Sequence, residues 1–263
     1  MQRRVAIGWM GSLALLAAGN SFAQVADLND AINKAGRQRM LSQRMAKAYL
    51  AVGQRVVTQR GQDILGASMA LFDRQLAELK AFAPTPEVKG TYGQLEVVWS
   101  DYKAVLVGQA PVRESAPALI ELDGKVLALA NKGTLQLEQL SGKPVGRLVN
   151  IAGRQRMLSQ RVAKFYLAQA WKASVPNAQM ELDKARAEFV AALEVLANAP
   201  EASVQIKQEI ELARNQWVFY EAALAQRGAD TAASERSTNV FLSSENILSV
   251  MDKVTGLYAR LAA

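Results

Sequence analysis

The sequence predicts an all-α protein built from two tandem up-down four-helix bundles. Long segments rich in Ala, Leu, Gln, Glu, Lys and Arg carry apolar residues at spacings of three and four, which is typical of amphipathic helices. No convincing run of alternating β-branched and polar residues indicates a strand. A stretch of ten residues, 35–44, recurs letter for letter as 152–161, 117 positions later. Because such identity does not arise by chance, the chain is a duplication.

Seven predicted breaks divide the chain into eight helices, four in each copy. The breaks contain Gly, Pro or both, and lie near 60–61, 83–86, 108–111, 142–144, 175–176, 199–200 and 227–230. We assign the first bundle to 24–142 and the second to 143–263. Four antiparallel helices return the chain to its starting direction, so the first helices of the two bundles can pack in parallel across a pseudo-twofold axis.

The first 23 residues are typical of an export signal rather than of the fold. Arg3 and Arg4 precede an apolar stretch at 5–18, and a small-x-small cleavage pattern occupies 21–23. We expect cleavage near Ala23 and a mature periplasmic protein. No later stretch approaches about 18 uninterrupted apolar residues, so we expect that protein to be soluble, without a second membrane helix or an output domain.

Composition excludes several classes of function. The chain has neither cysteine nor histidine, which removes disulfides, thiol chemistry, the commonest general base and the commonest metal ligand. We therefore predict no enzyme activity, no cofactor and no metal. The formal net charge is +7; export argues against a nucleic-acid partner, and the excess is concentrated around the repeated stretches. This distribution favours a local anion site.

The repeated stretches 35–44 and 152–161, called the boxes below, each place an arginine on an apolar helix face. On a helical wheel, Arg39 and Arg156 lie in the middle of a stripe of apolar and small residues. The other members of the two stripes are Leu28, Ile32, Ala35, Ala46 and Leu50, and Val149, Ala152, Ala163 and Leu167. Neither 31–62 nor 139–180 contains an Asp or Glu. A guanidinium buried there needs an acid from another helix or an external anion.

A glycine precedes each of these arginines by one helical turn and lets a partner helix or a ligand approach closely. If the two first helices meet at the glycines, the two arginines converge, and their planar donor groups suit a small planar oxyanion. The predicted ligand-binding residues are Arg39, Arg156, Gly36 and Gly153. Asn33 and Asn150 are expected to add amide donors and Arg44 and Arg161 to brace the pair, as secondary ligand-binding residues.

Two other interpretations of Arg39 and Arg156 stay open at this stage. The side chains could lie in solvent, as we expect for Arg37, Arg55, Arg60 and Arg147. They could also form ion pairs with a distant acid such as Asp73, Glu78 or Glu194. The two Trp-x-x-Tyr pairs are interpreted as core aromatics; they are Trp99 with Tyr102 and Trp217 with Tyr220.

The segments 33–44 and 150–161 resemble the signature of PilJ-type sensor domains, the periplasmic input domains of type IV pilus chemotaxis transducers. They are also similar to nitrate/nitrite sensor kinases, in which this box on the first helix is called the P-box. The resemblance implies a four-helix bundle that dimerises through its first helices and binds nitrate between two symmetry-related arginines. By position, these are Arg39 and Arg156, with Gly36 and Gly153 lining the site.

The leading hypothesis is a periplasmic sensor or binding protein for nitrate or nitrite, a monomer that acts as an intramolecular pseudodimer. Its state would pass to a membrane sensor kinase, a chemoreceptor or a transporter. The alternative is a helical interaction module that docks a membrane chemoreceptor or sensor without a small ligand, and it predicts exposed boxes.

Overall fold

The computed structural model describes residues 24–108, 110–225 and 232–261. These residues form α-helices and one 3-10 turn, with no strand among them, which confirms the predicted all-α class. The helices are α1 (Leu28–Gly53), α2 (Thr58–Phe82), α3 (Pro86–Gly108), α4 (Ala116–Ser141), α5 (Pro144–Ala170), α6 (Ala178–Ala197), α7 (Val204–Ala225) and α8 (Ala233–Arg260), and the 3-10 turn is η1 (Arg113–Ser115). The expected export signal and the expected break at 227–230 lie outside the described residues.

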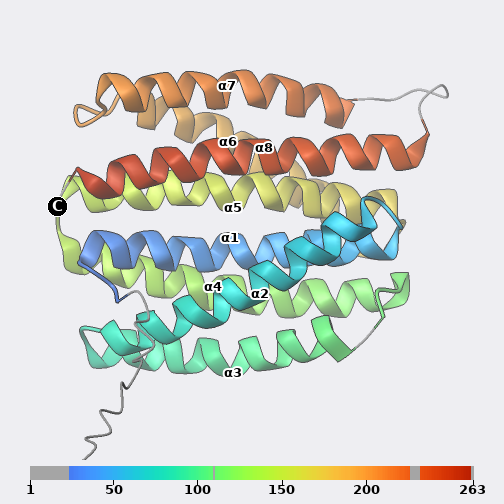
Figure 1. Ribbon diagram of the computed structural model, residues 1–263, viewed down its shortest axis with the longest axis horizontal. Coiled ribbons are helices and arrows are strands. Elements are labelled where there is room, and N and C mark those ends of the chain that lie inside the picture. The colour runs from blue at the N-terminus through green and yellow to red at the C-terminus, as the bar shows by residue number, and fades with distance from the viewer. Residues whose placement is uncertain (1–23, 109, 226–231, 262–263) are drawn as a thin grey trace, which may run out of the picture.

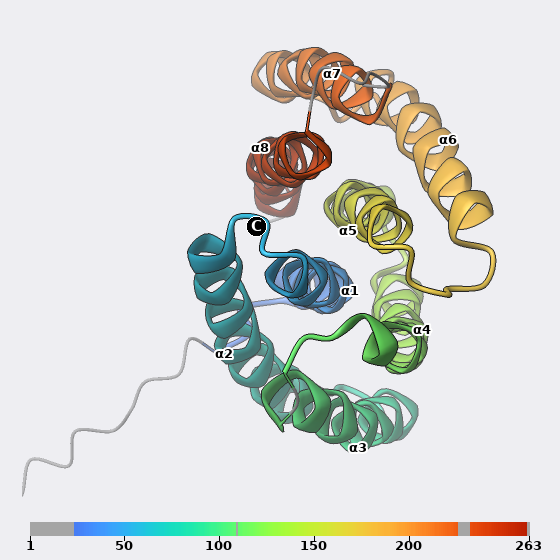
Figure 2. The same ribbon diagram turned by 90° about the vertical axis from the view of Figure 1, so that its right-hand side faces the viewer.

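Helices α1–α4 form one bundle and α5–α8 the other (Figures 1 and 2). Within the bundles, α1 packs against α2 and α4, and α5 packs against α6 and α8. The most extensive helix contact in the molecule joins α1 to α5, so the first helices of the two bundles form the centre of the protein.

Helices α1 and α5 run parallel, as predicted. A Cβ placed on Gly146 would lie 3.3 Å from the Ile32 side chain, near the start of both helices. Further along, Gly36 lies against Gly153, and Gly53 lies against Trp171 at the far end. Since the contacts advance in the same direction along both helices, the two boxes lie side by side.

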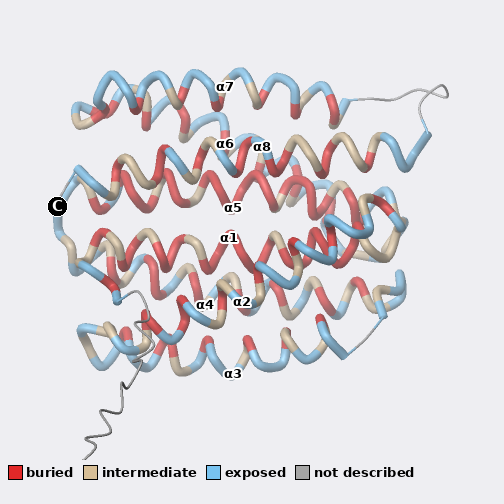
Figure 3. The backbone as a smooth tube through the Cα atoms, in the orientation of Figure 1, coloured by how far each residue is buried: buried red, intermediate tan, exposed pale blue. Residues whose placement is uncertain are grey.

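Burial follows from this central position. Figure 3 shows buried residues along nearly the whole length of α1 and α5, whereas the outer helices α3 and α7 are buried on one side only. Many α1 and α5 residues are small, and Ala31, Ala35, Ala152 and Ala163 are almost fully buried. Close approach of two helices needs such small side chains, so the box composition explains the tight central contact.

The predicted break at 60–61 is wrong. Helix α1 ends at Gly53, and Gly61 lies inside α2. The link contains two left-handed residues, Arg55 (φ 58°) and Val57 (φ 43°), neither of which is a glycine. A Cβ at Gly61 would lie 2.9 Å from the Val52 side chain, so this glycine permits close packing instead of forming the turn.

The two Trp-x-x-Tyr pairs are buried core aromatics, as predicted, and each belongs to the same kind of cluster in its bundle. Phe72 stacks on Trp99 and Phe189 stacks on Trp217, each with ring centroids 4.2 Å apart. The neighbouring tyrosines are buried, and their hydroxyls donate to box carbonyls: Tyr102 to Ser42 at 3.1 Å and Tyr220 to Ser159 at 2.9 Å. The cores therefore fix the rotation of α1 and α5.

Candidate functional site

The two stripe arginines converge at the contact between the bundles. Arg39 is 1% exposed and Arg156 is fully buried, so the interpretation that they lie in solvent is wrong. A Cβ on Gly36 would lie 3.3 Å from Arg39 Nη2 and 3.5 Å from Arg156 Nη2. A Cβ on Gly153 would lie 3.2 Å from Arg156 Nη2 and 3.7 Å from Arg39 Nη2. Both guanidiniums therefore lie over the same pair of glycines.

Arg39 is held by neutral oxygens. Its Nη1 donates to Asn131 Oδ1 at 2.9 Å, and its Nη2 donates to Asn150 Oδ1 at 2.7 Å and to the Asn150 carbonyl at 3.3 Å. Asn150 Nδ2 donates in turn to Glu138, so this amide stands between the guanidinium and that carboxylate. Among the described residues, Arg39 therefore has no direct ion pair.

Arg156 has a different set of partners. Its Nη1 donates to Asp252 Oδ1 at 2.5 Å, and its Nη2 donates to the Asn33 carbonyl at 3.0 Å. Asp252, whose side chain is 45% exposed, also pairs with Arg37 at 2.9 Å. The same oxygen of one carboxylate thus serves two guanidiniums, one buried and one half-buried.

These contacts correct two expectations. The acid that pairs with a stripe arginine is none of the three expected ones: Asp73 binds Trp99 and Lys103, Glu78 binds Lys34, and Glu194 binds Arg214. Arg37 was expected in solvent but is ion-paired to Asp252, whereas Arg55, Arg60 and Arg147 are exposed as expected. Asp252 is remote in sequence and only reaches the box because α8 packs along α5.

Positive charge predominates at the pair. Burial, then the charges of Arg154 and Arg156, lowers the pKa of Arg39 to about 9. Burial, then the charge of Arg37, lowers the pKa of Arg156 to about 10. Although burial alone raises the pKa of Asp252, Arg156 and Arg37 hold it at about 2. The Nε groups of Arg39 and Arg156 are buried without a hydrogen-bond partner in the described structure. The positive charge of the pair is therefore incompletely balanced, and two of its donors lack acceptors.

The family match agrees with this arrangement. The family model described as the N-terminal region of type IV pili methyl-accepting chemotaxis transducers, PilJ, matches residues 21–132 and 141–255. The chain belongs to the PilJ family. The two matched segments correspond to the two copies, each containing one box of this tandem PilJ protein. Comparison with curated proteins and with solved structures gave no significant match. No helix in the described part of the PilJ chain is long and apolar enough to cross a membrane.

Of the residues expected as secondary ligands in this PilJ protein, only the two asparagines contact the stripe arginines. Asn150 contacts Arg39 through its side chain, whereas Asn33 contacts Arg156 through its carbonyl and keeps a buried Oδ1 without a hydrogen-bond partner. The two bracing arginines lie further along the helices and have other partners: Arg44 pairs with Glu245, and Arg161 with Glu181 at 2.6 Å and Gln43 at 3.4 Å. Their expected role in ligand binding stays a prediction.

Sequence reasoning missed two buried lysines that join the bundles. Lys47 donates to Glu245 at 2.6 Å and to Ser244 at 2.8 Å, both on α8. Lys164 donates to Asp123 on α4 at 2.6 Å. The lysines follow the boxes at the same offset of 117, which is the signal that could have identified them. Their carboxylates lie on the opposite bundle, far from the boxes in sequence.

Proposed function

We propose that this PilJ protein is a periplasmic sensory domain that binds one small oxyanion, nitrate or nitrite, between Arg39 and Arg156. The observation that carries the proposal is the meeting of two buried guanidiniums, one from each bundle, over the Gly36–Gly153 contact. The resemblance of the boxes to those of nitrate/nitrite sensors supports the choice of ligand.

Electrostatics favours an anion at this point. Both guanidiniums have lost water, and this burial lowers the pKa of each; the nearby charges of Arg154 and Arg156 lower the pKa of Arg39 further, and that of Arg37 lowers the pKa of Arg156. A planar oxyanion accepts hydrogen bonds from several N–H groups and adds a negative charge between the two arginines. Gly36 and Gly153 let both guanidiniums lie close to the two helix backbones, where an anion would meet donors from both bundles. Asp252 neutralises Arg156 from a half-exposed side, so Arg39 is the stronger anion ligand of the two.

Signalling follows from the position of the site between the bundles. An anion that draws Arg39 and Arg156 together changes the α1–α5 contact, and a small shift of one bundle against the other would transmit the occupied state. The family is named for chemotaxis transducers. A membrane chemoreceptor, sensor kinase or transporter is the proposed receiver of that shift.

The alternative of a docking module without a small ligand has less support. That hypothesis expects the boxes on an exposed surface, whereas both stripe arginines are buried between α1 and α5. Docking through the boxes would require the two bundles to separate. We therefore favour the small-ligand hypothesis.

Calorimetric titration of the mature protein with sodium nitrate and sodium nitrite, against sodium chloride, tests the proposal. We expect binding of one anion per chain, lost in Arg39→Ala and Arg156→Ala and kept in Arg147→Ala, which removes an exposed arginine of α5. Sedimentation should show a monomer. The proposal fails if neither anion binds the wild type, or if Arg39→Ala binds with unchanged affinity.

A further inference from the structure

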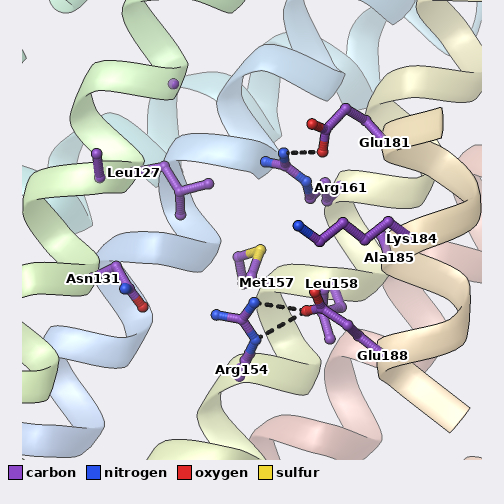
Figure 4. A pocket seen from close by; sticks show the side chains of 12 residues that line it. Leu127, Asn131, Arg154, Met157, Leu158, Arg161, Glu181, Lys184, Ala185 and Glu188 are labelled. Atoms are coloured by element: carbon purple, nitrogen blue, oxygen red, sulfur yellow. Dashed lines mark hydrogen bonds and ion pairs between the residues drawn. The ribbon is translucent and has the colours of Figure 1, made fainter. Parts of the chain in front are cut away.

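A pocket of about 310 Å³ opens between α4, α5 and α6, beside the arginine pair but outside it (Figure 4). It combines an apolar floor with charged walls. The α4–α6 pocket, as it is called here, is lined by Gly124, Leu127, Ala128, Asn131, Arg154, Met157, Leu158, Arg161, Glu181, Lys184, Ala185 and Glu188. Neither the two stripe arginines nor Gly36 and Gly153 line this pocket.

The pseudo-twofold axis relates this pocket to the region between α8, α1 and α2, called the α8 region below. Residues of α4 correspond to residues of α8 at an offset of 121, and the contacts confirm the alignment. Thr134 and Thr255 each donate to the carbonyl four residues earlier. Arg39 donates to Asn131 in one bundle, as Arg156 donates to Asp252 in the other.

The α8 region contains two carboxylates whose counterparts on α4 are not acids. Glu245 on α8 accepts from Arg44 and Lys47, and Asp252 accepts from Arg37. At the offset of 121, Glu245 corresponds to Gly124. Asp252 corresponds to Asn131. The cations of the α8 region are therefore paired with two acids of α8, and α4 supplies neither of these acids to the pocket.

Gly124 leaves open space at the position of the missing glutamate. A Cβ placed on it would meet no atom within 4 Å. Lys164, which corresponds to Lys47, is paired instead with Asp123. Arg161, which corresponds to Arg44, turns to Glu181 on α6 and leaves the space beside Gly124 unfilled.

Cations remain available at the walls of the pocket. Arg154 pairs with Glu188 through Nε and Nη2. In the described structure Lys184 has no ion pair, and Figure 4 shows its amino group pointing into the pocket between Arg154 and Arg161. Three cations face two carboxylates there, which leaves one positive charge to be balanced.

We propose that the α4–α6 pocket binds a small organic carboxylate. Its carboxylate lies beside Gly124, at the position that corresponds to Glu245, and pairs with Lys184. Its apolar body packs on Leu127, Met157 and Ala185. The single uncompensated positive charge favours a monocarboxylate over a dicarboxylate, and the apolar floor distinguishes it from an inorganic oxyanion.

The carboxylate site is separate from the proposed oxyanion site but shares one residue with it. Asn131 lines the pocket and accepts from Arg39. The two proposals rest on different residues, since the first needs Arg39 with Arg156 and the second needs Gly124 with Lys184. Either can fail without the other.

Gly124→Glu is the sharpest test because it supplies the missing carboxylate from the protein itself. Titration calorimetry with sodium butyrate, benzoate and succinate, against sodium chloride, is carried out on the wild type, Gly124→Glu and Lys184→Ala. The control is Gly66→Glu, an equally exposed helical glycine with no atom within 4 Å of its Cβ, on α2 away from the pocket. Arg39→Ala is included to separate the two sites, and nitrate is titrated into all variants.

We expect butyrate or benzoate to bind the wild type, Gly66→Glu and Arg39→Ala. The affinity should fall at least tenfold in Gly124→Glu and Lys184→Ala, and succinate should bind more weakly than the monocarboxylates. Circular dichroism checks that the variants are folded. No binding of any of the three carboxylates to the wild type would overturn the proposal, as would unchanged affinity in a folded Gly124→Glu.

Discussion

Asn131 on α4 and Asp252 on α8 occupy corresponding positions in the two bundles, and each accepts a hydrogen bond from the stripe arginine of its own bundle. The first gives Arg39 a neutral oxygen and the second gives Arg156 a carboxylate. The pseudosymmetric site is therefore electrically asymmetric, with its less compensated charge on Arg39.

Exchange of these two side chains should change anion affinity in opposite directions. Asp252→Asn removes the carboxylate that competes for Arg156, and we expect it to tighten nitrate binding about tenfold, or about 1.4 kcal/mol. Asn131→Asp gives Arg39 a carboxylate of its own and should weaken nitrate binding by a similar factor. Both substitutions are nearly isosteric, and calorimetric titration with nitrate measures the affinity of each variant. Equal affinities in the two variants would contradict the role of the pair.

The glycines at the helix contact should control ligand access more than stability. In Gly153→Ala the new methyl lies 3.2 Å from Arg156 Nη2, so that guanidinium must move by a few tenths of an ångström. Alanine also favours the helix by about 1 kcal/mol, which offsets the crowding. We expect a melting temperature near that of the wild type and a loss of nitrate affinity of about tenfold.

The matched control for that change is Gly90→Ala, at an exposed position of α3 with no atom within 4 Å of the added Cβ. It should raise the melting temperature and leave nitrate affinity unchanged. A Gly153→Ala variant that keeps full affinity would show that the glycine contact has no part in the site.

Much of this site could be predicted because the duplication repeats it. The spacing of Gly36 and Arg39, found again at Gly153 and Arg156, indicated a parallel helix contact with two converging arginines, and the structure shows that contact. Periodicity alone places a residue on a helix face. When the same polar residues are repeated on the apolar faces of two helices, the repetition also indicates that the two faces pack against each other.

The partners of the arginines could not be predicted in the same way. Asn131 and Asp252 lie on the last helix of each copy, where the offset has grown from 117 to 121, and because one is an amide and the other an acid they do not stand out as a repeated pair. Which acid reaches Arg156 depends on how α8 packs on α5, and helix rotation and register come from core packing. The aromatic clusters around Trp99 and Trp217 set that packing. The residue types in these clusters do not predict how far a side chain of α8 lies from the box.

Stability should fall in acid through the buried ion pair of Glu245. Burial raises the pKa of this carboxyl, but Lys47 and Arg44 outweigh it and hold the pKa at about 2, below the ordinary 4.5. Because the folded-state pKa is depressed, the contribution is complete above about pH 4.5 and is lost as the pH falls toward 2. Denaturant unfolding between pH 7 and pH 2.5 should show this decrease.

Glu245→Gln serves as the test of that assignment. It leaves Lys47 buried without a countercharge and should lower the free energy of unfolding at pH 7 by about 3 kcal/mol. Between pH 4.5 and pH 2.5, the free energy of unfolding of this variant should decrease less than that of the wild type. An acid decrease of the same size in both proteins would assign the effect to other carboxyls.

The far end of the α1–α5 contact should be the place where a single methyl destabilises the molecule. Gly53 ends α1 against Trp171, and a Cβ there would lie 2.3 Å from the indole Cη2 and 2.9 Å from the Pro111 carbonyl. The indole is part of the contact between the bundles and the carbonyl is backbone, so neither moves without cost. We expect Gly53→Ala to lower the free energy of unfolding by about 2 kcal/mol, although alanine favours a helix. Thermal unfolding of Gly53→Ala beside Gly90→Ala separates the two effects, since the second has the helix gain without the clash. A Gly53→Ala variant as stable as Gly90→Ala would mean that the bundles do not pack against each other at this end.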